Sequence, residues 1–404
     1  MDKDIIYFDN ASTTSVFKEV SDIICTYNEK LFFNPSGTYS QSKKIKQEIE
    51  NSRIIISKLI NCNPNEIFFT SSGTESNNWA IKGIAYRNIN VGNHIIISSI
   101  EHHSVENTCK YLEKNGFNIT KLKVDKNGFI DINQLEKTIT DKTILVSIIY
   151  ANNEIGVIQN ISKIGKICKK HNIIFHTDAV QAFGHVKIDV MKDNIDMLSI
   201  SGHKFGAPKG IGVLYINKKI KIDNLIEGGG QEKNKRSGTE NVSGIIALCK
   251  AAEITCTDFD KKNNYLLELR NYCINKITNE IPYCKLNGPI ENRLTNNVNF
   301  SFNFIEGESL VLRLNKYNIC CSTGSACSSN SLDPSHVLLA IGLPHELAHG
   351  SLRLTFSTKN TKPQIDYFII KLKEIVENLR NLSPLYEDFL KLNQNNKIKP
   401  LNQP

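Results

Sequence analysis

The sequence predicts an α/β protein whose larger part is built on a mainly parallel β-sheet, followed by a smaller α+β region. Between about residue 40 and residue 250, short apolar runs alternate with longer stretches of helical periodicity, which is typical of a parallel sheet covered by helices. The apolar runs are almost wholly hydrophobic, as expected of strands that are buried on both faces. Beyond that region the regular alternation stops, which favours a second unit of different construction.

Six apolar runs are predicted to be the strands of the larger part. They are residues 66–70, 94–100, 143–150, 172–179, 197–201 and 212–216. Helical patterns lie between several of them, at residues 75–88 and 104–116 for example. The segment 228–241, GGGQEKNKRSGTEN, contains no apolar side chain and is rich in glycine, so it is predicted to be a loop.

The second region is predicted from a mixture of helical and strand patterns. Helical patterns cover residues 245–254, 263–277 and 364–382, and strand-like patterns cover residues 296–304 and 352–357. We therefore place a large domain at residues 16–255 and a smaller α+β domain at residues 1–15 and 256–390. Residues 391–404 are rich in Asn and Lys and are predicted to form a flexible tail.

Composition excludes several classes of protein. The 404 residues carry 49 Lys plus Arg against 41 Asp plus Glu, a formal charge of +8, with 40% apolar and 22% charged residues, as in a soluble globular protein. The start lacks signal-peptide features, and no run reaches the roughly 18 apolar residues of a membrane span. We expect a cytoplasmic protein that binds no membrane. The basic residues are scattered, so direct nucleic-acid binding is not expected.

Cysteine usage points to a reducing compartment. The 11 cysteines are odd in number, widely spread and free of any CxxC pair, which argues against disulfides and the commonest zinc sites. Cys168 and Cys249 lie in apolar helical patterns and are predicted to fill the core.

Polar clusters follow several predicted strands, where open α/β sheets place their ligand sites. TSSGTESNN, with Gly73 and Thr74, opens a helix after residues 66–70; it predicts either an anion site or an ordinary N-cap. Asp178 ends a strand and Gln181 follows in DAVQ, where the carboxylate suits either a charged ring nitrogen or a helix cap. Lys204, in SGHKFGAPKGIG, suits imine formation or a solvated surface charge.

The ordered combination of these motifs favours one cofactor. With His102 in EHHSV and Asn153 in YANNEIG, the chain offers backbone amides for a phosphate, a ring to stack, a carboxylate for a ring nitrogen and a lysine for an aldehyde. Pyridoxal 5'-phosphate needs each of these. Through these motifs, and through YFDNASTT, KRSGTEN and STGSACSS, the chain resembles the class V aminotransferase family over nearly its whole length. Within that family it resembles the cysteine desulfurases of the NifS/IscS type.

The resemblance implies a fold of the pyridoxal-phosphate type I class, with a seven-stranded, mainly parallel sheet in the large domain. Lys204 would bind the cofactor aldehyde, Asp178 would pair with the pyridinium nitrogen, and Gln181 would bond the phenolic oxygen. His102 would stack on the ring and move protons, and Asn153 would lie beside cofactor and substrate. The phosphate would be held by Gly73, Thr74, Ser201 and His203, with Thr239 supplied by the other subunit of a homodimer.

The decisive thiol is Cys327. It lies in CCSTGSACSSN among small residues that cannot bury a sulfur, whereas Cys320 and Cys321 continue an apolar stretch and are predicted to be structural. The resemblance gives Cys327 the role of persulfide carrier and Arg353 the role of binding the substrate carboxylate. The implied reaction converts L-cysteine to L-alanine. Implied sulfur acceptors are an iron–sulfur scaffold protein of the IscU/NifU type and the proteins of transfer RNA thiolation, and Cys327 would contact a nascent cluster.

Competing interpretations remain open beside this one. The scaffold could serve a selenocysteine lyase, an ordinary aminotransferase or a non-catalytic docking protein. HELAH, residues 345–349, matches a zinc-protease pattern, but Pro344 and Gly350 flank it, so no resident metal site is expected. Three departures from the family pattern stand out: Phe33 replaces a glycine near the expected site entrance, LTFSTKN follows Arg353, and the tail is rich in Lys and Asn.

Overall fold

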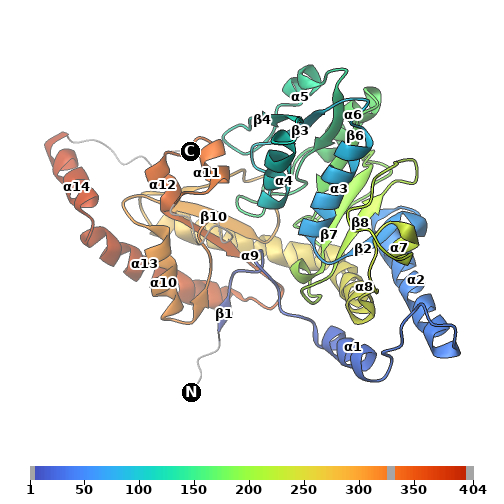
Figure 1. Ribbon diagram of the computed structural model, residues 1–404. Coiled ribbons are helices and arrows are strands. Elements are labelled where there is room, and N and C mark those ends of the chain that lie inside the picture. The colour runs from blue at the N-terminus through green and yellow to red at the C-terminus, as the bar shows by residue number, and fades with distance from the viewer. Residues whose placement is uncertain (1–4, 325–332, 397–404) are drawn as a thin grey trace.

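The protein is described by a computed structural model that covers residues 5–324 and 333–396 (Figure 1). A larger unit contains the seven-stranded sheet, and a smaller unit is formed by most of the C-terminal third of the chain. The N-terminal strand β1 (Ile6–Tyr7) pairs in parallel with β11 (Ile319–Cys320), so the start of the chain belongs to the smaller unit. Our division at residues 15/16 and 255/256 stays a prediction.

The large sheet has the order β2-β8-β7-β6-β5-β3-β4. Its strands are β2 (Ile67–Thr70), β3 (His94–Ser98), β4 (Asn118–Leu122), β5 (Thr143–Ser147), β6 (Ile174–Asp178), β7 (Met197–Ser201) and β8 (Gly212–Ile216). Only β8 runs antiparallel to its neighbours in this sheet. The mainly parallel seven-stranded sheet is therefore confirmed, and the six runs predicted as strands each contain one.

The seventh strand, β4, was missed by the sequence reading. It lies at the edge of the sheet beside β3, and Asn118 and Lys121 are exposed. An edge strand can be polar because one side and part of its faces meet water. Its sequence, NITKL, therefore lacks the continuous apolar signal of the inner strands.

Helices cover both faces of the sheet because its strands alternate their side chains between two cores. One core holds Phe68, Ile97 and Leu214 with residues of α3 (Gly73–Arg87) and α4 (His103–Glu113). The other core holds Phe69, Ile96 and Val213 with residues of further helices. Those helices are α2 (Ser40–Ile60), α5 (Ile132–Thr138), α6 (Ile161–Lys170) and α8 (Val242–Cys256), and α1 (Lys18–Glu29) adds Val20.

The segment 228–241 is a loop with one short helical turn, α7 (Gln231–Asn234). Glu232, Lys233 and Asn234 have φ between 45° and 62°. Such left-handed backbone is costly for residues other than glycine and needs external support. Glu232 supplies support: its buried carboxylate accepts two hydrogen bonds of 2.9 Å from Arg53 and one of 2.8 Å from the backbone N–H of Phe69.

The smaller unit is built on an antiparallel sheet with the order β12-β10-β9. The elements of this unit are α9 (Phe259–Glu280), β9 (Cys284–Leu286), β10 (Asn297–Phe302), α10 (Gly307–Asn315), α11 (His336–Ala340), α12 (His345–His349), β12 (Ser351–Thr355), α13 (Lys362–Asn381) and α14 (Pro384–Asn396). Phe300, Phe302 and Leu354 lie in a separate core with residues of α9, α10 and α13. Helices α11 and α12 instead pack against Ile100 and Ile149 of the larger unit. The chain crosses from the larger unit between α8 and α9.

Helix α14 extends into the segment that we predicted to be a flexible tail, and the flexibility of that tail stays a prediction. This helix continues to Asn396, so residues 391–396 are helical; residues 397–404 lie outside the described part. Within the described ranges, none of the helices has the length and apolar character needed to cross a membrane.

Candidate active site

A cavity of about 520 Å³ lies at the carboxyl ends of the central strands and is lined by residues of both units. That size suits a small cofactor with its substrate. It brings together ten residues selected from the sequence: Gly73, Thr74, His102, Asn153, Asp178, Gln181, Ser201, His203, Lys204 and Arg353. Local sequence explains part of this, because β6 ends at Asp178 and β7 ends at Ser201.

Two predicted site residues fall outside this group. Cys327 lies outside the described residues. Thr239 is exposed on the loop 228–241 and does not line the cavity of its own chain. Arg236 of the same loop bonds Glu75 in the first turn of α3, at 2.8 Å and 3.1 Å. The loop is thereby tied to the helix that opens into the cavity.

Lys204 extends toward the N-terminal segment from a single turn of 3₁₀-helix, Gly202–Lys204, that follows β7. Its Nζ donates hydrogen bonds to the carbonyl oxygens of Ala11 and Ser12, at 2.7 Å and 2.8 Å. Gln181 also donates to Ala11, at 2.9 Å. The N-terminal segment, which the sequence assigned to the smaller domain, therefore forms one wall of the cavity.

Asp178 is a buried carboxylate held by two donors. It is 3% exposed, and its Oδ2 accepts a 2.7 Å hydrogen bond from the amide of Asn77, while Oδ1 accepts one of 3.0 Å from the N–H of Val180. A carboxylate that is fixed and shielded from water can pair strongly with a cationic ring nitrogen. The family resemblance implies this task for Asp178.

His102 caps α4 and is held in one tautomer. Its Nδ1 accepts a 3.1 Å hydrogen bond from the N–H of Ser104, and the Ser104 hydroxyl lies 2.8 Å from the same nitrogen. Because a backbone N–H can only donate, Nδ1 is unprotonated and the neutral ring carries its proton on Nε2. Burial lowers the pKa of His102, although the charge of Asp178 opposes this. The ring is therefore a donor at Nε2 near neutral pH.

Asn77 connects these two groups and was missed by the sequence reading. Its Nδ2 donates both to Asp178 and to Ser104, the latter at 2.8 Å, so it bridges the buried carboxylate and the capping network of His102. The only signal in the sequence is that Asn77 stands four residues after Gly73, which puts both on one face of α3.

The start of α3 fits a phosphate group. Ser72 caps the helix by accepting from the N–H of Glu75, and the first N–H groups of a helix have no acceptor within it. Gly73 leaves room there: a Cβ at this position would lie 2.6 Å from Val180 Cγ2. Burial, followed by the charges of Lys204 and Lys209, lowers the pKa of His203 to about 4. His203 is therefore a neutral hydrogen-bonding group in the absence of an anion.

Arg353, on β12, is 2% exposed and already has acceptors. Its Nη2 bonds Asp9 Oδ1 and Ser12 Oγ, both at 2.8 Å, and Nη1 bonds the carbonyl oxygen of Asn153 at 3.2 Å. Its Nε is buried without a partner among the described residues. Asp9, within YFDNASTT, was not selected from the sequence. The guanidinium is thus oriented before any substrate carboxylate arrives.

The residues Gly324 and Ser335, on either side of 325–332, are held by side-chain hydrogen bonds, and the partner of Ser335 lines the cavity. Gly324 donates from its N–H to Ser351 Oγ at 3.1 Å, and Ser335 Oγ donates to Glu154 Oε2. Glu154 is completely buried, and burial raises its pKa to about 7 despite the bond from Ser335 and the charge of Arg353.

The ten described cysteines are all free thiols. Cys168 and Cys249 are buried, as predicted. Cys321 is buried and Cys320 is half-buried, and burial raises the pKa of both. Neither thiol has the exposed setting of a nucleophile.

Two sequence features take no part in the cavity. HELAH forms the five-residue helix α12, and both of its histidines, His345 and His349, are exposed. Phe33, expected near the site entrance, instead stacks on Phe32 with ring centroids 4.9 Å apart and meets Tyr39 edge to face. It does not line the cavity of its own chain.

The stretch that follows Arg353 packs tightly. Phe356 is buried and lies edge to face on Phe8, with ring centroids 5.2 Å apart. Asn360 accepts a 2.7 Å hydrogen bond from the N–H of Ser357, which closes the turn before α13.

Comparison with known proteins agrees with this geometry. Residues 6–368 match the family model described as aminotransferase class-V. The chain is 53% identical over 388 residues to cysteine desulfurase IscS of Clostridium botulinum (strain Hall), covering 96% of this chain and 98% of the relative. It is similar to the solved structure of a NifS-like protein, with a TM-score of 0.88, 35% identity and coverage of 93% and 100% of the two chains.

A further solved structure described as SspA in complex with cysteine has a TM-score of 0.78 and 37% identity, covering 87% of this chain and 99% of that one. Family membership therefore rests on sequence and structure together. The chain belongs to the class-V aminotransferase family, in its branch of NifS/IscS-type cysteine desulfurases.

Proposed function

We propose that this cysteine desulfurase uses pyridoxal 5'-phosphate to convert L-cysteine to L-alanine and leaves the sulfur as a persulfide on Cys327. One observation carries the proposal: Lys204, Asp178, His102 and Arg353 face a single cavity beside the helix start at Gly73. An amine, a fixed carboxylate, a neutral imidazole and a guanidinium are together suited to hold this cofactor with an amino-acid substrate. The cysteine complex of the related SspA supports the choice of substrate.

The cofactor supplies, when bound, an electron-poor ring that stabilises negative charge at the substrate α-carbon. Lys204 would hold the cofactor through its aldehyde, and its amine would take the substrate α proton. Asp178 keeps the ring nitrogen protonated, because a carboxylate held by Asn77 and Val180 stays in place and away from water. His102 carries its proton on Nε2, so that nitrogen is the one from which the ring would donate to the substrate or cofactor.

Substrate orientation comes from Arg353. Its guanidinium is fixed by Asp9, Ser12 and Asn153, so little conformational entropy is lost when the substrate carboxylate binds. Nε remains available for that carboxylate.

Sulfur transfer is the task of Cys327. Its thiolate attacks the substrate sulfur, a new sulfur–sulfur bond forms and the substrate carbon–sulfur bond breaks. The substrate carbon keeps the electron pair and takes a proton, so that one thiol and one L-cysteine give one persulfide and one L-alanine. Gly324 precedes Cys327 in the chain and bonds Ser351, and Ser335 follows it and bonds the cavity residue Glu154.

The working assembly is a cytoplasmic homodimer in this proposal. Thr239 is exposed on a loop that is tied to α3, which supports a role in the other subunit's phosphate site. The name of the related IscS proteins supports delivery of sulfur to an iron–sulfur scaffold, where Cys327 contacts the nascent cluster. Delivery to the acceptors of transfer RNA thiolation is a further part of the proposal.

The test is to incubate the holoenzyme with L-cysteine and a reductant and to measure sulfide and alanine together. Equal amounts are expected from the wild type and from Cys25→Ala, a control that removes an exposed thiol. Cys327→Ala should lose sulfide release while keeping the visible absorption of the cofactor, and Lys204→Ala should lose both activity and the native absorption. Stoichiometric persulfide from Cys327→Ala, or a keto acid in place of alanine, would contradict the proposal.

A further inference from the structure

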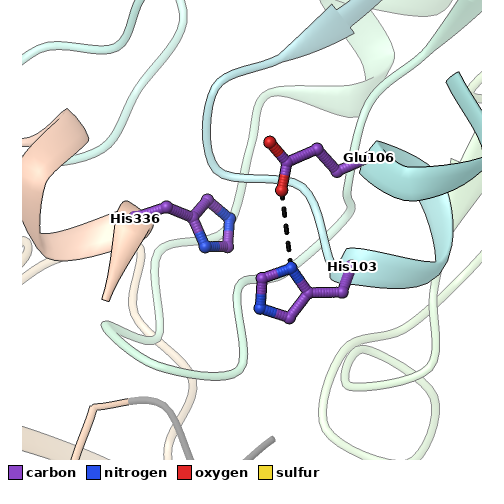
Figure 2. Close-up of side chains that lie close together, drawn as sticks. All are labelled: His103, Glu106 and His336. Carbon is purple, nitrogen blue, oxygen red and sulfur yellow. Dashed lines mark ion pairs between the residues drawn. The ribbon is translucent and has the colours of Figure 1, made fainter. Parts of the chain in front are cut away.

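Three metal-ligating side chains outside the proposed reaction converge beside the cavity: His103, Glu106 and His336 (Figure 2). One ligand atom of each lies within 4.8 Å of the other two. His103 and Glu106 are one turn apart on α4, and His336 begins α11 of the smaller unit. Both histidines also line the active-site cavity. The cluster joins the two units, so it is formed by the packing of α11 against α4 and not only by residues that are close in sequence.

We propose that this cluster binds one divalent transition-metal ion of the Zn²⁺ class. Two imidazoles and one carboxylate form a recurring ligand set for such ions. His103 Nδ1 lies 3.4 Å from Glu106 Oε2. Two ligands of a tetrahedral ion with bonds of about 2.0–2.1 Å are roughly 3.4 Å apart, so this pair is already spaced for one. The ligand atom of His336 lies within 4.8 Å of the other two, so closing the set to the roughly 3.4 Å spacing of a tetrahedral ion needs a shift of up to about 1.4 Å.

The carboxylate has one oxygen for the ion. Glu106 Oε1 accepts from Lys121 at 2.8 Å and from Lys110 at 3.1 Å, while Oε2 faces His103. Burial raises the pKa of Glu106, but the hydrogen bonds from Lys121 and Lys110 have the larger combined effect and lower this pKa to about 2. The group is therefore ionised at neutral pH, as a metal ligand must be.

His336 is also prepared for an ion. Burial lowers its pKa, with an opposing effect from its bond to Glu101, so the ring is neutral near pH 7. Its Nε2 lies 2.9 Å from the carbonyl oxygen of Glu101, which fixes the ring orientation. An ion either takes Nδ1 or replaces the proton on Nε2.

The surrounding charges select the class of ion. Lys110 and Lys121 reduce the electrostatic attraction for any cation, which disfavours Mg²⁺ and Ca²⁺, ions that depend on several oxygen ligands. Binding therefore depends on the two imidazoles, which favours Zn²⁺ and the other late first-row transition-metal ions. Without an ion, His103 and Glu106 form an ordinary pair one helical turn apart.

An ion held by three protein ligands keeps an open position. Since His103 and His336 line the cavity, that position lies within reach of the thiolate of bound L-cysteine, itself a strong zinc ligand. Zn²⁺ should therefore slow the enzyme. This consequence rests on the proposed function, whereas the binding of the ion does not.

The experiment titrates ZnCl₂ into the holoenzyme against a chromophoric chelator, in a Cys327→Ala background that removes one competing thiol. The matched control is His349→Ala, which removes an exposed histidine of α12. The background protein and the control should bind one tight equivalent. His103→Ala and His336→Ala should each raise the Kd for zinc by at least roughly 10–100-fold. That is the cost of losing a residue that only hydrogen-bonds a metal ligand, and loss of a ligand itself should cost no less.

X-ray absorption at the zinc edge should show two nitrogen ligands from imidazole. The site would be overturned if His336→Ala bound zinc as tightly as His349→Ala, or if no saturable equivalent appeared in either protein. In active enzyme with Cys327 intact, micromolar Zn²⁺ should inhibit wild type and His349→Ala more than His336→Ala. Tight binding without inhibition would keep the metal site and overturn only its effect on the reaction.

Discussion

Arg353 and Asp9, which are 344 residues apart in the chain, form an ion pair with Nη2 and Oδ1 separated by 2.8 Å. The arginine is almost completely buried, and the aspartate lies in the N-terminal segment that also bonds Lys204 through neighbouring carbonyl oxygens. One short segment of chain thus positions both Arg353 and Lys204, the residues to which the proposed function gives the substrate carboxylate and the cofactor aldehyde.

The first prediction concerns this ion pair. Asp9→Asn removes the charge that orients Arg353, and a charge-assisted hydrogen bond is worth about 1.5–3 kcal/mol. We expect the KM for L-cysteine to rise about tenfold or more, with kcat within about threefold of the wild type. Steady-state kinetics measure this, with Asp22→Asn on the exposed face of α1 as the control. An unchanged KM would show that Arg353 does not need Asp9.

The second prediction concerns the hydroxyl of Ser104, which lies 2.8 Å from His102 Nδ1. Ser104→Ala removes the hydroxyl that bonds Nδ1 and leaves one donor of Asn77 unpaired, at a cost of about 1–3 kcal/mol. We expect kcat to fall roughly tenfold and its pH profile to shift, without loss of bound cofactor. Ser104→Thr keeps a hydroxyl and should restore most of the rate. If kcat of Ser104→Ala equalled that of the wild type, the hydrogen bonds of Ser104 to Asn77 and His102 would have no role in the reaction.

The third prediction is a pH dependence of stability. Burial raises the pKa of Glu101 to about 8, against the effect of its bonds from Ser98 and Ile149, while an unfolded chain has a value of about 4.3. Between these values the native protein binds more protons than the unfolded one, so the free energy of unfolding falls as pH rises toward 8. Glu101→Gln lacks this dependence.

Urea unfolding of the wild type and Glu101→Gln checks the point. The stability of the variant relative to the wild type should increase between pH 5.5 and pH 8, by up to about 3 kcal/mol. Glu113→Gln, an exposed change on α4, should show no such trend. Parallel pH curves for wild type and Glu101→Gln would mean that Glu101 is ionised in the native protein.

The fourth prediction concerns Arg53 and Glu232, whose side chains are 3% and 4% exposed. Glu232→Leu removes the buried carboxylate that pairs with Arg53 and leaves only the partly exposed Glu50 as an ion partner; loss of a buried partner costs about 3–5 kcal/mol. The double variant Arg53→Met/Glu232→Leu should recover at least half of this. The exposed pair of Lys187 and Asp260 gives the control, because Asp260→Asn should change stability by less than about 0.5 kcal/mol.

Urea unfolding measures these stabilities, and cofactor retention measures the effect on the loop 228–241. We expect Glu232→Leu to release cofactor more readily, since the loop that carries Thr239 is held by this pair. Full stability in Glu232→Leu would show that the left-handed turn at residues 232–234 needs no such support.

The sequence predicted the position of polar residues that stand at or just after the end of an apolar strand. Asp178 ends one apolar strand and Lys204 follows another, so their placement at one edge of the sheet could be predicted from strand periodicity. Sequence reasoning failed at β4, whose polar edge position hides the pattern, and at Asn77, whose role depends on two partners distant in the chain.

By itself, the sequence determined the mainly parallel sheet and nominated the polar residues that line the cavity, because these depend on periodicity, residue type and spacing. Only the tertiary structure decided how these residues are held. The pairing of Asp9 with Arg353, the bridge of Asn77 and the meeting of His103 with His336 each join side chains from different elements. Such contacts depend on packing and burial, which are properties of the folded chain and not of any segment within it.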